Sequence, residues 1–94
     1  MFTKTKKNQI INLRRNIDKL DRQIIKLIAQ RLNVVKKIGE TKMRQKVKVF
    51  DKNREIEVLA RVKKLAKVSE IDPRFIERIF KLIIKASKRI QNEK

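Results

Sequence analysis

The sequence has no cysteine, histidine, tryptophan or tyrosine, and its 94 residues include one glycine and one proline. Without cysteine there is no disulfide and no thiolate ligand for a metal. Without histidine as well, a zinc or iron site would need carboxylates alone, so we predict neither a metal site nor a cofactor. The scarcity of glycine and proline removes the usual turn signals, which favours a few long elements.

Long apolar runs are also absent. No stretch approaches the length that spans a membrane, and the first ten residues, MFTKTKKNQI, are basic without the apolar core of a secretory signal. We therefore expect a soluble, cytoplasmic protein with no membrane-spanning segment. Because only 40% of so short a chain is apolar, we expect residues 1–94 to form a single domain with a thin core, which favours oligomerisation.

Charge of one sign dominates the composition. The 28 Lys and Arg residues outnumber the 10 Asp and Glu residues and give a net charge of +18, which favours anionic partners. This charge leaves open a basic helical module that binds nucleic acid. The basic residues, however, are spread along the whole chain, and no aromatic side chains are interleaved with them as stacking platforms for bases. We therefore do not expect a nucleic-acid partner.

What the sequence does contain is helical periodicity, and a long helix is predicted over about residues 8–43. Its apolar residues recur at steps of three and four, which is typical of pairing with another long helix. Arg31 stands where the next apolar residue of this series is expected, and Gly39 inside the helix indicates close packing against a neighbour. The series consists of Ile10, Leu13, Ile17, Leu20, Ile24 and Leu27.

Two shorter helices follow, over about residues 51–67 and 73–91. Asp51 is the predicted N-cap of the first, and the pair Asp72-Pro73 marks the start of the second. The segment RQKVKV between the first two helices is predicted as a connector, and a short strand stays open as an alternative. The fold class is therefore all-α, with one long and two shorter helices. Their predicted buried faces are Ile56, Leu59, Val62 and Leu65 or Ala66 on one, and Ile76, Phe80, Ile83 and Ile84 on the other.

Polar residues interrupt these apolar faces. Lys42 follows Arg31 by eleven residues, which places both on one helix face roughly 16 Å apart along the axis. Ser87 and Gln91 continue the apolar face of the last helix and share that face. Each residue alone has a structural explanation, such as a snorkelling side chain or a fraying helix end. Together they form a donor-rich set whose burial would need partners, and a small anionic ligand would supply them.

At this point five elements, in order, resemble a known family, the all-helical or type II chorismate mutases. The elements are LRRNIDKLD (13–21), IIxLIAxR (24–31), IGxxK (38–42), FDKNRE (50–55) and IIKASKRIQ (83–91). The resemblance implies an isomerase that rearranges chorismate to prephenate in phenylalanine and tyrosine biosynthesis. It also implies an intertwined homodimer of three-helix protomers.

The resemblance further implies which residues bind the dianionic substrate. Arg14 and Arg31 would bind its two carboxylates, and Lys42 would contact a carboxylate and the ether oxygen. Arg14 and Arg31 are seventeen residues apart, roughly 25 Å along a straight helix. Arg14 would therefore reach the site from the antiparallel first helix of the partner.

The remaining site residues implied by the resemblance come from the second and third helices. Asp51, through its backbone, and Glu55, through its carboxylate, would hold the substrate hydroxyl, and Arg54 would support the site. Ser87 would lie near a carboxylate, and Gln91 would donate to the ether oxygen. Lys42, Gln91 and Arg31 would be the catalytic residues of this set.

One rival enzyme remains within the same substrate class. An isochorismate pyruvate lyase uses a similar helical fold, and the sequence alone leaves this alternative open. The intact DKNRE element, with Glu55 available to hold a hydroxyl, favours the mutase.

Overall fold

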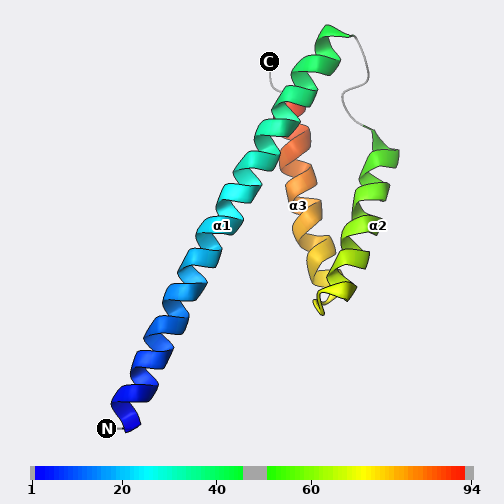
Figure 1. Cartoon of the computed structure of the whole chain (residues 1–94). Helices are drawn as coiled ribbons and strands as arrows, with labels where there is room; N and C mark the ends of the chain where they lie inside the picture. Colours follow the sequence, from blue (N-terminus) through cyan, green and yellow to red (C-terminus); the bar gives the residue numbers. More distant parts are fainter. Residues whose placement is uncertain (1, 46–50, 93–94) are drawn as a thin grey trace. The chain divides into compact units, whose positions relative to one another are not determined.

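The structure, a computed structural model, describes residues 2–45 and 51–92. These residues form three α-helices, α1 (Phe2–Arg44), α2 (Lys52–Val68) and α3 (Pro73–Asn92), and no strand (Figure 1). The predicted all-α class with one long and two shorter helices is confirmed. The first helix starts earlier than the expected residue 8, because the lysine-containing segment before it is compatible with helix. Residues 46–50, which include most of the predicted connector, lie outside the described residues.

The chain divides into two compact units, residues 1–31 and residues 32–94, called the first and second unit below. The described residues of the first unit, 2–31, are all helical. Its six periodic apolar residues, called the α1 stripe below, are exposed: Ile10, Leu13, Ile17, Leu20, Ile24 and Leu27. The second unit contains the end of α1 together with α2 and α3. Among the described residues, no helix combines the length and the apolarity needed to cross a membrane.

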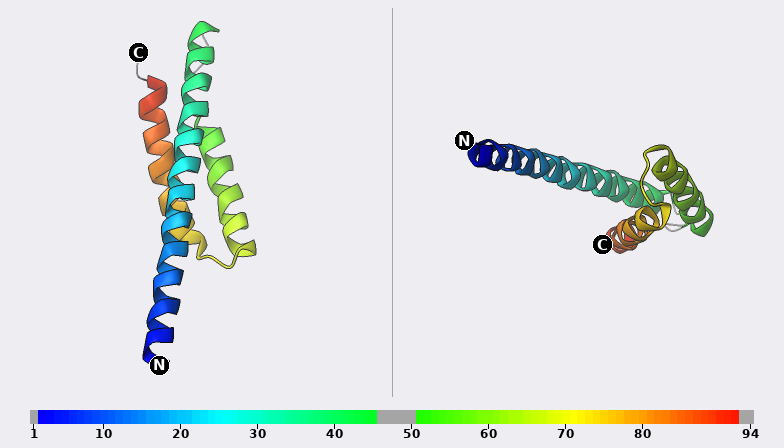
Figure 2. Two further views of the ribbon diagram at one scale, coloured as in Figure 1. Left: turned by 60° about the vertical axis from the view of Figure 1, so that its left-hand side comes forward. Right: turned by 90° about the horizontal axis from the view of Figure 1, so that it is seen from below.

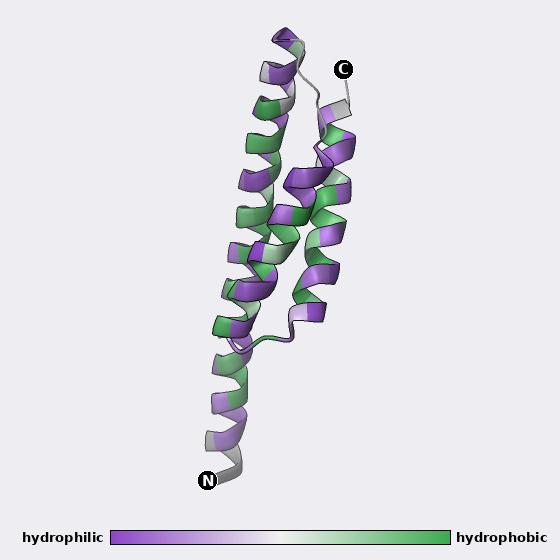
Figure 3. Ribbon diagram, turned by 90° about the vertical axis from the view of Figure 1, so that its right-hand side faces the viewer, coloured by the Kyte–Doolittle hydropathy of each residue, from purple (hydrophilic) through white to green (hydrophobic). Residues whose placement is uncertain are grey.

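The centre of the second unit is a hairpin in which α2 and α3 pack side by side (Figure 1; Figure 2). Both helices are amphipathic, with green apolar and purple polar segments alternating along them in Figure 3. The core of the hairpin consists of Val58, Val62 and Ile84, and further apolar side chains pack around it. These surrounding residues are Leu59, Ile76 and Phe80.

The buried face of α2 differs in part from the prediction. Val62 and Ala66 are buried as expected, and Val58, which the prediction missed, joins them at a spacing of four residues. Ile56 was predicted to be buried, but it is 59% exposed. Of the two predicted alternatives, Ala66 is buried and Leu65 is 57% exposed. Around the helix, Ile56 and Leu65 lie about 120° and about 60° from Val62, the middle of the three buried positions, beyond the strip that a single neighbouring helix covers.

The turn between α2 and α3 is held by backbone hydrogen bonds. The N–H of Ile71 donates to the carbonyl of Ala66 at 2.8 Å, and the N–H of Glu70 donates to the carbonyl of Lys67 at 3.1 Å. Glu70 has a φ of 59°, in the left-handed region that such a C-terminal motif requires. The oxygen Oδ1 of Asp72 then accepts from the N–H of Arg74 at 2.9 Å, so Asp72 caps α3 as predicted. This bond lowers the pKa of Asp72.

Candidate active site

The end of α1 meets the end of α3 at Gly39. A Cβ atom on this residue would lie 3.2 Å from the Cα atom of Gln91 and 3.4 Å from its Cγ atom. The predicted close packing at Gly39 is therefore confirmed, and its neighbour is a residue of the predicted site. Any larger residue at position 39 would press on the backbone of α3 where it carries Gln91.

A cleft of about 540 Å³ lies beside this contact in the second unit, and Gln91 contributes to its wall. The side chain of Gln91 is half-buried, as is that of Lys42 on α1. The polar groups that line the cleft are the ammonium of Lys36, the carboxylate of Glu40 and the amides of Asn33 and Gln91. Lys42, also predicted for the site, is not among the lining residues. The lining residues are Leu32, Asn33, Lys36, Gly39, Glu40, Met43, Ile90 and Gln91.

Ser87 is buried on α3, one turn before Gln91. Its hydroxyl donates to the carbonyl of Ile83 at 2.7 Å, the local bond that serine commonly makes inside a helix. To donate to a substrate carboxylate, the hydroxyl has to leave this bond. It can accept a hydrogen bond without leaving it, because a hydroxyl oxygen has two lone pairs.

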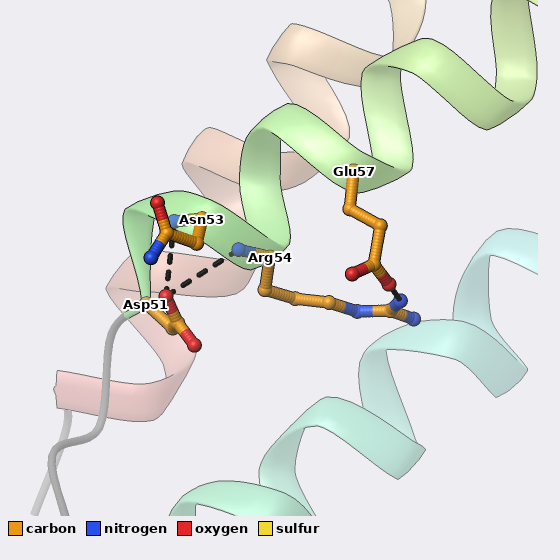
Figure 4. A network of polar contacts seen from close by, with 4 residues as sticks. All are labelled: Asp51, Asn53, Arg54 and Glu57. Carbon is orange, nitrogen blue, oxygen red and sulfur yellow. Dashed lines mark hydrogen bonds and ion pairs between the residues drawn. The ribbon is translucent and has the colours of Figure 1, made fainter.

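The first turn of α2 carries three of the predicted residues, and Figure 4 shows two of them. Oδ1 of Asp51 accepts from the N–H of Asn53 at 2.9 Å and from the N–H of Arg54 at 3.4 Å, so Asp51 is the N-cap as predicted. The guanidinium of Arg54 pairs with Glu57 through a 2.5 Å bond between Nη1 and Oε1. Both side chains of this pair are largely exposed, so it contributes little to stability.

Glu55, the third of these residues, forms an ion pair with Lys88 of α3. Its oxygen Oε2 lies 3.3 Å from Nζ of Lys88, and the two side chains are 24% and 39% exposed. Lys88 was not among the residues predicted for the site. Its position between Ser87 and Gln91 in the element IIKASKRIQ was the available signal, but sequence alone does not show which carboxylate faces it.

The two arginines predicted to bind the substrate carboxylates, Arg14 and Arg31, belong to the first unit. Arg14 is exposed and Arg31 is half-buried, and both lie on the continuous helix α1. Seventeen residues of helix separate them by roughly 25 Å, so one chain does not bring them together. Among the described residues, the structure has no group of three or more His, Cys, Asp or Glu side chains that could hold a metal ion.

Comparison with known proteins identifies the class of protein to which this three-helix chain belongs. Residues 13–92 match the profile of the family described as chorismate mutase type II. The chorismate mutase of Methanocaldococcus jannaschii is 31% identical over 85 residues, which cover 90% of this chain and 86% of that protein. The chain therefore belongs to the type II chorismate mutase family.

Two longer relatives agree with this assignment. The bifunctional chorismate mutase/prephenate dehydratase of Escherichia coli K12 is 34% identical over 83 residues, which cover 88% of this chain and 22% of that enzyme. The T-protein of Enterobacter agglomerans is 30% identical over 86 residues, which cover 92% of this chain and 23% of that protein. The chain thus spans most of the Methanocaldococcus relative but about a fifth of these longer proteins.

Proposed function

We propose that the protein catalyses the rearrangement of chorismate to prephenate in the biosynthesis of phenylalanine and tyrosine. The observation that carries this proposal is the family match over residues 13–92, a range that includes all eight residues proposed to bind the substrate. The names of the relatives favour this reaction over the isochorismate pyruvate lyase, the alternative from the same substrate class. A cytoplasmic location and the lack of a nucleic-acid partner remain predictions.

The reaction is unimolecular and pericyclic, so it needs no nucleophile, no covalent intermediate and no cofactor. One contribution of the enzyme is orientation, because the flexible enolpyruvyl arm has to be held over the ring. In our proposal Arg14 of the partner and Arg31 bind the two carboxylates, with Ser87 beside one of them. The backbone of Asp51 and the carboxylate of Glu55 fix the ring hydroxyl, and Arg54 supports the site.

The second contribution is electrostatic. Negative charge develops on the ether oxygen as its C–O bond breaks, and donors aimed at that oxygen stabilise the transition state. We assign this task to the ammonium of Lys42 and the amide of Gln91. The packing of Gln91 against Gly39 supports its part, because it limits the movement of the backbone that carries the amide. Loss of one such donor typically costs about 3–4 kcal/mol of activation free energy.

The proposal includes a homodimer, and the exposure of the α1 stripe supports it. Full burial of a Leu or Ile side chain stabilises by about 1.5–3 kcal/mol, and the six exposed residues of the stripe offer this gain to a partner helix. An antiparallel pairing of two α1 helices would carry Arg14 of one chain toward Arg31 of the other. This arrangement accounts for two carboxylate-binding arginines that lie far apart in one chain.

The proposed reaction is tested by following the loss of chorismate absorbance with purified protein, with prephenate identified as the product. We expect rapid loss with the wild-type protein and a loss of activity of at least about a hundredfold in Arg31→Ala. Release of pyruvate from isochorismate, in place of prephenate formation, would support the lyase. A folded protein that leaves chorismate unchanged at every enzyme concentration would refute the proposed function.

The shared site is tested by mixing Arg14→Ala and Arg31→Ala chains. Each homodimer lacks an arginine in both sites, whereas a heterodimer has one intact site and one site that lacks both arginines. We expect recovery of up to about a quarter of wild-type activity after full exchange, because half of the dimers are then heterodimers with one working site. No recovery after verified subunit exchange would refute the contribution of Arg14 across the interface.

A further inference from the structure

Among the described residues, two ion pairs connect α2 to α3, one near each end of the hairpin. Near the turn, Nζ of Lys63 lies 2.7 Å from Oε2 of Glu77, with side chains 42% and 27% exposed. At the open end, Nζ of Lys88 lies 3.3 Å from Oε2 of Glu55, with side chains 39% and 24% exposed. The two pairs are alike in chemistry, in exposure and in joining the same helices. They differ in two respects: Glu77 also has Nζ of Lys81 at 4.0 Å from its Oε1 atom, and only the second pair contains a residue of the proposed substrate site.

The geometry of the second pair leaves Glu55 able to bind a ligand. A carboxylate has two oxygens and about four lone-pair positions. Lys88 contacts Oε2, which fixes the carboxylate group and leaves Oε1 as an acceptor for a hydroxyl. Arg54, the cation next to Glu55 in the sequence, is engaged with Glu57 and does not perform this task.

We propose that Lys88 is a positioning residue, which holds the Glu55 carboxylate so that its second oxygen meets the ring hydroxyl of chorismate. This inference rests on the proposed function. A glutamate side chain has several rotatable bonds, and their ordering opposes binding unless they are fixed beforehand. Lys88 fixes them from the facing helix before the substrate arrives. It thereby links the ends of α2 and α3 that carry Glu55 and Gln91.

The test compares Lys88→Met with Lys63→Met, which removes the matching ammonium from the other pair. Circular dichroism establishes that each variant is folded, and Lys88→Gln replaces Lys88→Met if the latter is not. With chorismate, we expect Lys88→Met to lower kcat/KM roughly tenfold, Lys88→Arg to restore most of it, and Lys63→Met to stay within about twofold of wild type.

Two further measurements separate positioning from direct contact with the substrate. The first uses a chorismate analogue in which hydrogen replaces the ring hydroxyl. If Lys88 acts through Glu55 on that hydroxyl, wild type and Lys88→Met should process the analogue with kcat/KM values within about twofold of each other. The second places Lys88→Met in a Glu55→Gln background, where we expect no more than about a twofold additional loss.

Three outcomes would overturn the assignment while leaving the proposed function intact. Equal losses in Lys88→Met and Lys63→Met would make both pairs simple clamps of the hairpin. A tenfold loss that persists with the analogue, or in the Glu55→Gln background, would mean that Lys88 acts independently of Glu55. A wild-type protein without activity on chorismate would instead refute the proposed function, and this assignment with it.

Discussion

The two units of the chain differ in where their apolar side chains lie. In the second unit, Val58, Val62 and Ile84 are 4%, 5% and 7% exposed in a core that α2 and α3 build together. In the first unit, Ile17 and Leu20 are each 55% exposed although they belong to a regular apolar stripe. Helical periodicity is regular in both units, so periodicity alone does not show whether an apolar residue is buried within the chain.

The same contrast applies to the proposed site. The second unit holds together the residues that would bind the hydroxyl and the ether oxygen, since Glu55 is tied to α3 and Gln91 is packed against Gly39. The first unit supplies Arg14 and Arg31, which one chain keeps apart. In the proposed site, one of the two carboxylate-binding arginines therefore comes from a second chain. Variants in the first unit should lower activity through loss of dimerisation, and variants in the second unit should lower stability or activity within one chain.

The largest effect is expected from a charge on the α1 stripe. Leu20→Glu places a carboxylate in the apolar face of both proposed partners, which should prevent dimerisation at micromolar concentration and lower kcat/KM at least about a hundredfold. Analytical ultracentrifugation and the chorismate assay measure the two quantities. Arg22→Glu, on the opposite face of the same helix, is the control and should remain dimeric. A dimeric, active Leu20→Glu protein would show that the stripe is not the interface.

The next effect concerns the core of the second unit. Ile84→Ala removes buried atoms between α2 and α3 and should lower the free energy of unfolding by about 2–4 kcal/mol. Val68→Ala, which changes an 83% exposed side chain, should alter it by less than about 0.5 kcal/mol. Urea unfolding of both variants at one fixed protein concentration provides the comparison, because association contributes to apparent stability. Equal values for the two variants would contradict the description of the core.

A smaller and more selective effect is expected at Gly39. Gly39→Ala gains about 1 kcal/mol of helix propensity, but its Cβ atom would press on the backbone at Gln91. These contributions oppose each other, so the free energy of unfolding should change by less than about 1 kcal/mol. The displacement of Gln91 should lower kcat/KM roughly tenfold.

Lys37→Ala, an exposed position on the opposite face of α1, is the matched control for Gly39→Ala. It should leave kcat/KM within about twofold of wild type. Unchanged kinetics in Gly39→Ala would show that the contact between α1 and α3 does not set the position of the Gln91 amide.

The smallest effect is the pH dependence of the hairpin. The hydrogen bond from Lys63 and its charge lower the pKa of Glu77 below the ordinary value of 4.5. A lowered folded-state pKa contributes stability above the unfolded value, and this is lost as the pH falls through the lowered pKa. The melting temperature should therefore decline below about pH 4.5, and less steeply in Glu77→Gln. A decline of the same slope in both proteins would exclude Glu77 as a contributor.

Much of the fold follows from local rules that sequence shows directly. Asp51 and Asp72 cap their helices as predicted, because a side-chain oxygen before a helix finds free N–H groups within three residues. The close contact at Gly39 was likewise predictable, since a lone glycine inside a helix indicates that another backbone approaches. The roles of the eight proposed substrate residues rest on a resemblance to a family and stay predictions.

What sequence did not show depends on how helices face each other. The exposure of Ile56 and the burial of Val58 were missed because α2 has apolar residues over more of its circumference than one neighbouring helix covers. The pair of Glu55 and Lys88 was missed because its partners are thirty-three residues apart and meet only through the register of the hairpin. Such pairings depend on how the helices pack against each other, which the local sequence pattern of each helix does not predict.

The tight turn between α2 and α3 also bears on the order of folding events. Only residues 69–72 separate the two helices, so their contacts close a short loop, and such local contacts form quickly. The hairpin should therefore appear in a fast phase whose rate does not depend on protein concentration. In the proposed homodimer, pairing of the α1 helices requires two chains to meet, so it should follow in a second phase that accelerates as the protein is concentrated. Catalytic activity during refolding should accordingly lag behind the recovery of helical signal, by an interval that dilution lengthens.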